Sequence, residues 1–226
     1  MISLLFGLVL WSCGDDLLAR AEQAYRDGRW AEAHSLYATA LLDPATPRGP
    51  VLFNLGTCAY RAGQVPEAIL CWRRAQLRAP HDAQIAFNIR RAEQELGLAA
   101  PVRAWHEWAT PTELLGIVIM LQLAGILGFL ACRRRGLRAG AGLMVLATVL
   151  PGVAAVSHAC AEQPASAVVL PARIPLRLEP HAEAGSLATL PAGSLVRIVA
   201  MSERWALVEG PALRGWVDRT GIALVD

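Results

Sequence analysis

The chain has 226 residues, a formal net charge of +2 and 54% hydrophobic residues. Apart from one arginine cluster, its basic residues are scattered, so the sequence does not predict a nucleic-acid-binding surface. The length allows more than one domain. The apolar excess comes from a few long uncharged stretches. This distribution is typical of a membrane protein in which polar domains precede and follow the apolar segments along the sequence.

The first thirteen residues, MISLLFGLVLWSC, are apolar up to Trp11. Such an amino-terminal stretch is typical of an export signal, although this one lacks a basic start. Leu10-Trp11-Ser12-Cys13 also resembles a lipoprotein cleavage box, which would place a lipid on Cys13. Residues 1–13 are therefore expected to be a signal peptide or an N-terminal anchor. Cleavage, lipidation and retention of this segment all stay open.

Residues 14–100 contain an internal repeat. The stretches AYRDGRWAEAHSLYATALLDP (24–44) and AYRAGQVPEAILCWRRAQLRAP (59–80) match at an offset of 35 residues. Small residues at the matching positions let paired helices approach, large ones fill the space beside them, and glycines make the turns. The tract at 82–96 repeats the first helix only. We therefore expect an all-α solenoid of two tetratricopeptide repeats plus a capping helix. The matching pairs are Gly28 and Gly63, Ala33 and Ala68, Tyr37 and Trp72, and Ala40 and Ala75.

The first helices of such repeats line a groove that can hold a peptide. Aromatic side chains with interleaved arginines suit an extended or helical peptide, because guanidinium groups bind carboxylates. In the alternative interpretation, the tyrosines pack and the arginines solvate the surface. The basic residue and asparagine that clamp carboxylate tails in chaperone-binding repeats are replaced by Leu18 and Glu22. The candidate peptide-binding residues are Tyr25, Arg26, Phe53, Asn54, Thr57, Tyr60, Arg61, Phe87 and Arg91.

Two long uncharged stretches follow, LLGIVIMLQLAGILGFLAC (114–132) and AGAGLMVLATVLPGVAAV (139–156). A helix rises about 1.5 Å per residue, so either stretch is about long enough to cross the hydrocarbon core of a bilayer. The sequence predicts an interfacial linker at 101–113 and transmembrane helices at 114–132 and 139–157. A buried helical hairpin in a soluble domain is the weaker alternative.

The loop between the two stretches, at 133–138, determines the expected orientation. Short loops rich in arginine stay in the cytoplasm, and neither outer flank carries a comparable cluster. We therefore expect a multi-pass protein of the bacterial inner membrane, with its N- and C-terminal domains both on the periplasmic side. The topology determinants are Arg133, Arg134, Arg135 and Arg138.

Residues 158–226 change to a strand pattern. SLVRIVAM (194–201) alternates apolar and polar residues, and LPAGS and GPALRG are turn sequences, which together indicate a small all-β barrel. Leu176-Arg177, the LPAG turn, Trp205 and Gly215-Trp216-Val217 resemble a bacterial SH3 domain. The turn after Leu176-Arg177 departs from that family's small glycine turn. Trp205 and Trp216 are the candidates for an SH3-like groove.

A search for catalytic chemistry finds no nucleophile elbow, zinc-protease helix or phosphate-binding glycine loop. The five histidines do not show metal-ligand spacing, and no cofactor motif is present, so an enzyme, a metal and a cofactor are all unexpected. Five cysteines without a CxxC spacing argue against a zinc site or a disulfide framework. Cys58 and Cys71 fall on adjacent helices, where they either pair or fill the core.

The order of exported repeats, membrane hairpin and terminal SH3-like domain resembles the BatE-type proteins of bacterial aerotolerance operons. This resemblance implies a non-enzymatic, membrane-anchored envelope scaffold. The implied partners are von Willebrand factor A-type membrane proteins and a MoxR-type ATPase system. The alternative function is a module that binds the cell wall or senses the envelope, in which the SH3-like domain holds peptidoglycan and the repeats are a spacer.

Overall fold

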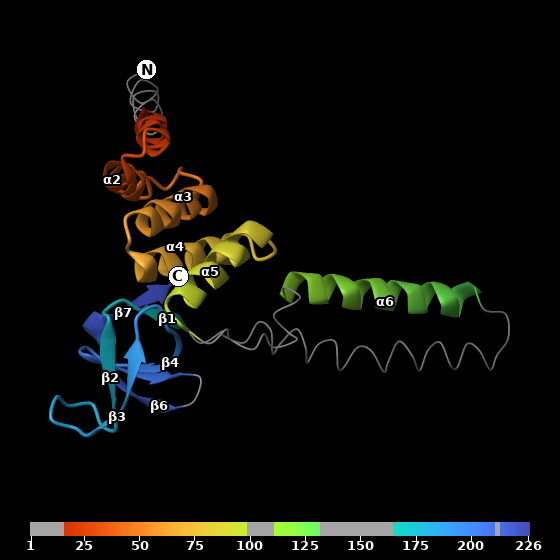
Figure 1. Cartoon of the computed structure of the whole chain (residues 1–226). Coiled ribbons are helices and arrows are strands. Elements are labelled where there is room, and N and C mark those ends of the chain that lie inside the picture. The colour runs from red at the N-terminus through yellow and green to blue at the C-terminus, as the bar shows by residue number, and fades with distance from the viewer. Residues whose placement is uncertain (1–15, 99–110, 132–164, 211–212) are drawn as a thin grey trace, which may run out of the picture. The chain divides into compact units, whose positions relative to one another are not determined.

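The computed structural model describes residues 16–98, 111–131, 165–210 and 213–226. The chain forms two compact units. Residues 1–101 and 164–226 make one unit, and residues 102–163 make the other. The first unit joins a helical region to a β-sheet that lies far from it in the sequence (Figure 1).

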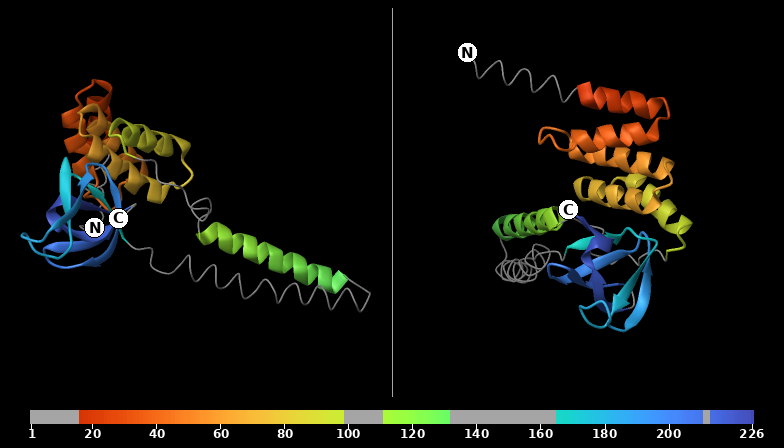
Figure 2. Two further views of the ribbon diagram at one scale, coloured as in Figure 1. Left: turned by 60° about the horizontal axis from the view of Figure 1, so that its bottom comes forward. Right: turned by 90° about the vertical axis from the view of Figure 1, so that its left-hand side faces the viewer.

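The helical region consists of stacked antiparallel helices, as the right-hand view of Figure 2 shows. Residues 16–26 are helical and precede α2. The following helices are α2 (Trp30–Ala40), α3 (Arg48–Arg61), α4 (Val65–Arg78) and α5 (Ala83–Glu95). The prediction of tetratricopeptide-like helical repeats followed by one further helix is confirmed.

The repeat-matched residues make the contacts expected of them. Ala33 and Ala68 are completely buried, and Tyr37 and Trp72 are buried beside them. A Cβ atom on Gly56 would lie 2.8 Å from the Trp72 ring, so only glycine lets α3 approach α4 this closely. Gly63 has φ +80° in the α3–α4 turn, a backbone conformation that glycine adopts without strain.

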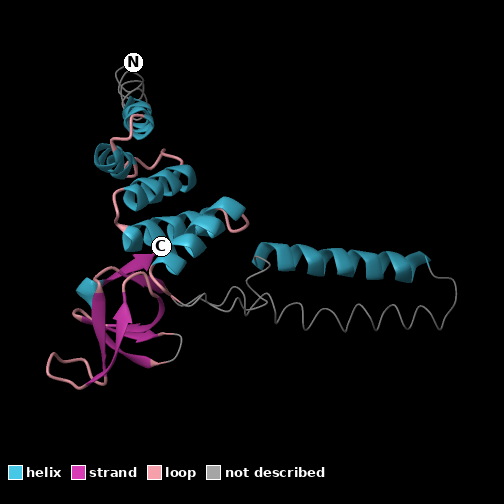
Figure 3. Cartoon of the chain, in the orientation of Figure 1, coloured by secondary structure: helices cyan, strands magenta, loops and turns pink. Residues whose placement is uncertain are grey.

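The C-terminal region is an antiparallel sheet of seven short strands, drawn in magenta in Figure 3. In space, the strands follow the order β3-β2-β6-β5-β4-β1-β7. The prediction of an all-β C-terminal region is confirmed, because its residues form short antiparallel strands. The likeness to an SH3 domain stays a prediction. The strands are β1 (Ser166–Val169), β2 (Arg173–Arg177), β3 (Ser186–Pro191), β4 (Leu195–Met201), β5 (Trp205–Glu209), β6 (Arg214–Asp218) and β7 (Ile222–Val225).

Alternation builds the sheet's own core, in which Leu176, Val196, Val208 and Val217 are buried. Gly215 explains one of the motifs seen in the sequence. A Cβ atom at Gly215 would lie 2.8 Å from the backbone oxygen of β2 at Arg177, which cannot move aside as a flexible side chain can. Glycine at this position therefore allows β6 to pair with β2.

The sheet also packs against the helical repeats. Val168 of β1 is buried in the same apolar cluster as Ile69 of α4. The Arg74 guanidinium donates hydrogen bonds of 2.8 and 3.1 Å to the Leu224 carbonyl and contacts the Asp226 carboxylate at 3.0 Å. The sequence predicted that the last helix alone would cover the end of the stack. The structure adds β1 and β7 to that cover, because α4 retains apolar surface that α5 does not bury.

The second unit contains α6 (Pro111–Ala131). This helix begins three residues before the predicted start at Leu114, at a proline, which suits a first helical position because it lacks an N–H group. Among the described residues, no helix is both long enough and apolar enough to cross a membrane. The predicted signal or anchor at 1–13, the arginine loop at 133–138 and the second apolar helix at 139–157 lie outside the described residues.

Candidate functional site

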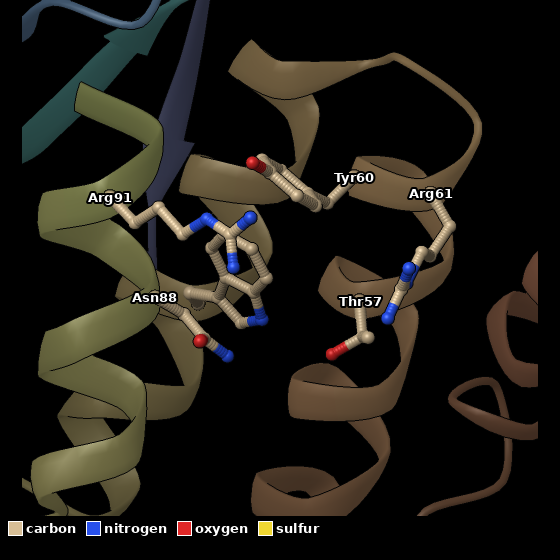
Figure 4. A pocket seen from close by; sticks show the side chains of 6 residues that line it. Thr57, Tyr60, Arg61, Asn88 and Arg91 are labelled. Carbon is tan, nitrogen blue, oxygen red and sulfur yellow. The ribbon is translucent and has the colours of Figure 1, made fainter. Parts of the chain in front are cut away.

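The candidate site is a pocket of about 140 Å³ on the groove surface of the repeats, shown in Figure 4. Side chains of α3 and α5 face each other across it, and α4 lies behind. Four of the sequence-predicted groove residues meet here. The pocket, called the groove pocket below, is lined by Thr57, Tyr60, Arg61, Trp72, Asn88 and Arg91.

Trp72 provides a fixed apolar wall for the groove pocket. The residue is 2% exposed, and its indole N–H donates to the Phe53 carbonyl at 3.2 Å. The Tyr60 ring lies 5.6 Å from the Trp72 ring, and the Tyr60 hydroxyl donates to the Glu95 carboxylate at 2.6 Å. This hydrogen bond, helped by partial burial, raises the pKa of Tyr60. Tyr60 therefore connects α3 to α5 as well as lining the site.

The two arginines of the groove pocket rest on aromatic rings. The Arg91 guanidinium carbon lies 5.8 Å from the centre of the Tyr60 ring, and that of Arg61 lies 5.7 Å from the Trp30 ring. Neither guanidinium forms an ion pair with a carboxylate among the residues that the structure describes. Both exposed side chains thus carry a positive charge without an ion-pair partner among the described residues and lie against aromatic rings, an arrangement suited to an anionic group.

The remaining predicted residues lie away from the groove pocket or support its walls. Tyr25 packs edge-on against Trp30 with 5.2 Å between ring centres, and Arg26 donates to the Gln23 side chain. The Asn54 amide donates to the Tyr37 hydroxyl at 3.3 Å, which ties it to the repeat core. Phe53 is half-buried, whereas Phe87 on α5 is 56% exposed and remains available to a ligand.

Sequence reasoning missed two residues of this surface. Asn88 lines the groove pocket, and it stands 34 residues after Asn54, so the repeat alignment contained a signal for it. Trp30 begins α2 and connects Tyr25 with Arg61. No spacing pattern marked Trp30, because its matching position in the next repeat is Val65.

In the sheet, Trp205 and Trp216 lie on adjacent strands, and both are partly exposed. Trp216 pairs with Leu207 across the ladder and with Arg177 on its other side. Trp205 pairs with Asp218, two positions from Trp216, so both tryptophans share the face opposite the sheet core. The Arg204 guanidinium lies 5.9 Å from the Trp205 ring centre.

The two described cysteines are buried free thiols. Burial raises the pKa of Cys58 to about 11 and that of Cys71 to about 12, so both thiols stay protonated and unreactive at neutral pH. They fill the core between the paired helices. In the described parts of the chain, no group of three or more His, Cys, Asp or Glu side chains is placed to hold a metal ion.

No protein-family model matches this chain, and no curated protein sequence does. Similar solved structures include PcrH from Pseudomonas aeruginosa, at 18% identity and a TM-score of 0.36 over 61% of this chain and 92% of PcrH. The translocator chaperone SycD of the Yersinia enterocolitica type III secretion system is 21% identical, with a TM-score of 0.34 over 61% of this chain and 83% of its own. At these values, the likeness is limited to helical architecture.

Proposed function

We propose that this chain is a non-enzymatic, membrane-anchored scaffold of the bacterial cell envelope, whose repeats hold a segment of a partner protein in the groove. The groove pocket carries the proposal. It combines a buried, hydrogen-bonded aromatic wall at Trp72 with two arginines that have no ion-pair partner among the described residues. Aromatic and arginine side chains in such a setting are the usual anchors of protein interfaces.

Membrane anchoring belongs to the same proposal and draws support from residues 114–132 and 139–157. The large apolar side chains of α6 are exposed, with Met120 at 67% and Leu127 at 65%. Contiguous apolar surface of this kind needs a cover, and lipid provides one. Because the sheet packs on α4, the repeats and the sheet form one compact unit. The chain leaves this unit after residue 98 and enters it again near residue 165. A two-helix hairpin satisfies that geometry, with the arginine loop in the cytoplasm and both ends periplasmic.

The proposed partners are envelope proteins, as the domain order of BatE-type proteins suggests: von Willebrand factor A-type membrane proteins and, through them, a MoxR-type ATPase system. The second candidate function is binding of peptidoglycan by the C-terminal domain. The partly exposed Trp205 and Trp216 on one face of the sheet favour that candidate, because aromatic rings can stack on sugars.

Two variants of α5 distinguish the two functions. In Asn88→Phe the new ring fills the groove pocket, whereas Arg90→Phe places the same ring at an exposed position two residues on, toward the opposite side of the helix. We expect Asn88→Phe to abolish co-purification of envelope proteins from native membranes and Arg90→Phe to preserve it. If Asn88→Phe changes nothing and sedimentation with peptidoglycan depends on Trp205 and Trp216, the scaffold proposal is wrong and the cell-wall function replaces it.

A further inference from the structure

The groove pocket brings together the donor groups of three polar side chains. Arg61 extends from α3 and Arg91 from α5, and the Asn88 amide lies on the Arg91 side of the pocket, across from Arg61 (Figure 4). Each guanidinium contacts an aromatic ring and has no carboxylate partner among the described residues. Asn88 forms no side-chain hydrogen bond within the described residues. A ligand that enters the pocket therefore meets several donors and a net positive charge.

The nearby carboxylate of Glu95 is already engaged. It accepts the Tyr60 hydroxyl hydrogen at 2.6 Å and makes no ion pair with Arg91, although it lies four residues further along the same helix. Consequently, Glu95 holds the Tyr60 ring and forms no direct ion pair with Arg61 or Arg91, and the two arginines with Glu95 leave a net charge of about +1. Because Glu95 holds the Tyr60 ring on which Arg91 stacks, the ring is already in place before an anion binds, which lowers the entropic cost of binding.

The walls and size of the groove pocket narrow the choice of anion. A volume of about 140 Å³ accommodates one side chain rather than a length of backbone. The Tyr60 and Trp72 rings offer an apolar surface to methylene groups, and the guanidiniums offer bidentate donors to a carboxylate. A glutamate side chain has both parts, with two methylenes leading to a carboxylate. A terminal carboxylate has no such stem, and a phosphate has no apolar part.

We infer that the groove pocket anchors one glutamate side chain of the partner segment, which inserts between Arg61 and Arg91. This inference rests on the proposed function, since it names the residue that the groove recognises. It also predicts a partner segment that is acidic in at least one position and apolar beside it, because Phe87 is exposed next to Asn88 on the same helix.

The test uses the purified full chain in detergent and four pools of labelled peptides. The peptides are acetylated and amidated at their ends, random in sequence, and carry Glu, Gln or Lys at the centre. The fourth pool has Ala at the centre and a free terminal carboxylate. Fluorescence anisotropy should show the Glu pool binding about tenfold or more tightly than the Gln pool, since hydrogen bonds to charged groups exceed neutral ones by that order. Arg61→Gln and Arg91→Gln should each remove this preference, and Arg90→Gln should keep it.

The outcomes separate the inference from the proposed function. Equal binding of the Glu and Gln pools, or a preference for the free terminus, overturns the glutamate anchor but leaves the groove as a peptide site. Loss of the preference in Arg90→Gln as well would assign the effect to general charge and also overturn the anchor. If no pool binds and Asn88→Phe leaves envelope proteins bound, both the anchor and the groove function are wrong.

Discussion

Gly193 lies in the turn between β3 and β4 and provides a test of whether the sheet and the repeats form one body. Its φ is +78°, and a Cβ atom there would lie 2.5 Å from the end of Leu96 and 3.0 Å from the end of Ile69. Both are repeat residues. Gly193→Ala therefore changes the sheet at a point where it touches α4 and the end of α5.

Gly63→Ala is the matched control. Gly63 has φ +80°, and a Cβ added there has no atom within 4 Å, so Gly63→Ala should lose only the stability that a left-handed alanine costs, about 1–2 kcal/mol. Gly193→Ala should lose the same amount of stability and, in addition, that due to crowding against Leu96 and Ile69. The clashing atoms are the ends of flexible side chains, so this addition should be near the lower end of the range, about 1 kcal/mol. For a chain of this size, each kcal/mol lowers the melting temperature by roughly 2–4 °C.

The assay is thermal unfolding of the full chain in detergent, followed by the helical circular dichroism signal. We expect Gly193→Ala, a change in the sheet, to lower the helical midpoint more than Gly63→Ala does. If Gly193→Ala leaves the helical midpoint unchanged while Gly63→Ala lowers it, the two parts unfold independently and the shared core is not a stabilising interface.

Three further predictions concern packing, pH and topology. Ala68 is fully buried, so Ala68→Leu should overpack the contact between paired helices and cost roughly 1–3 kcal/mol in a chemical denaturation experiment; an unchanged midpoint would refute the packing. The folded-state pKa of Cys71, about 12, lies above the ordinary value of 9.0. Above pH 9 the thiol of the unfolded chain ionises while the buried thiol does not. The contribution of Cys71 to stability is therefore complete below pH 9 and falls as the pH rises toward 12. Between about pH 8 and pH 10 the parent protein should therefore lose roughly 1 kcal/mol more stability than Cys71→Ala, and equal losses would contradict the raised pKa of Cys71. Alkaline phosphatase fused after Asp226 should be active, and its activity should fall when the loop arginines are replaced by neutral residues. An inactive but well-expressed fusion would exclude a periplasmic C-terminus. Those loop residues are Arg133, Arg134, Arg135 and Arg138.

The sequence predicted the repeats because their physical requirements recur at a fixed offset. Gly28 and Gly63 need the same left-handed turn, and Ala33 and Ala68 the same close helix contact. The alternation in β4, β5 and β6 was also readable, because each of these strands buries one face, whereas β1 and β7 show no such alternation. These features depend on neighbours within about forty residues and are therefore visible in a local pattern.

The packing of the sheet on α4 could not be read in this way. It brings Arg74 to the Leu224 carbonyl across 150 residues, and a backbone acceptor leaves no trace in the sequence. The Arg73–Glu93 ion pair could not be predicted either, because the sequence does not show which of its scattered arginines is buried beside a carboxylate. In the groove, the sequence pointed to Arg61, Arg91 and Tyr60. The structure was needed to show that Asn54 bonds to Tyr37 outside the pocket lining and that Asn88 lies within it.

The most direct test of the central claim is site-specific photo-crosslinking of the full chain in native membranes. A photo-reactive amino acid replaces Asn88 in the groove pocket or, in the control, Arg90 toward the opposite side of α5. We predict a discrete adduct with an envelope protein from position 88 and none from position 90, with the crosslinked segment containing a glutamate. Adducts from position 90 alone, or from neither position while the C-terminal sheet retains peptidoglycan, would contradict the account.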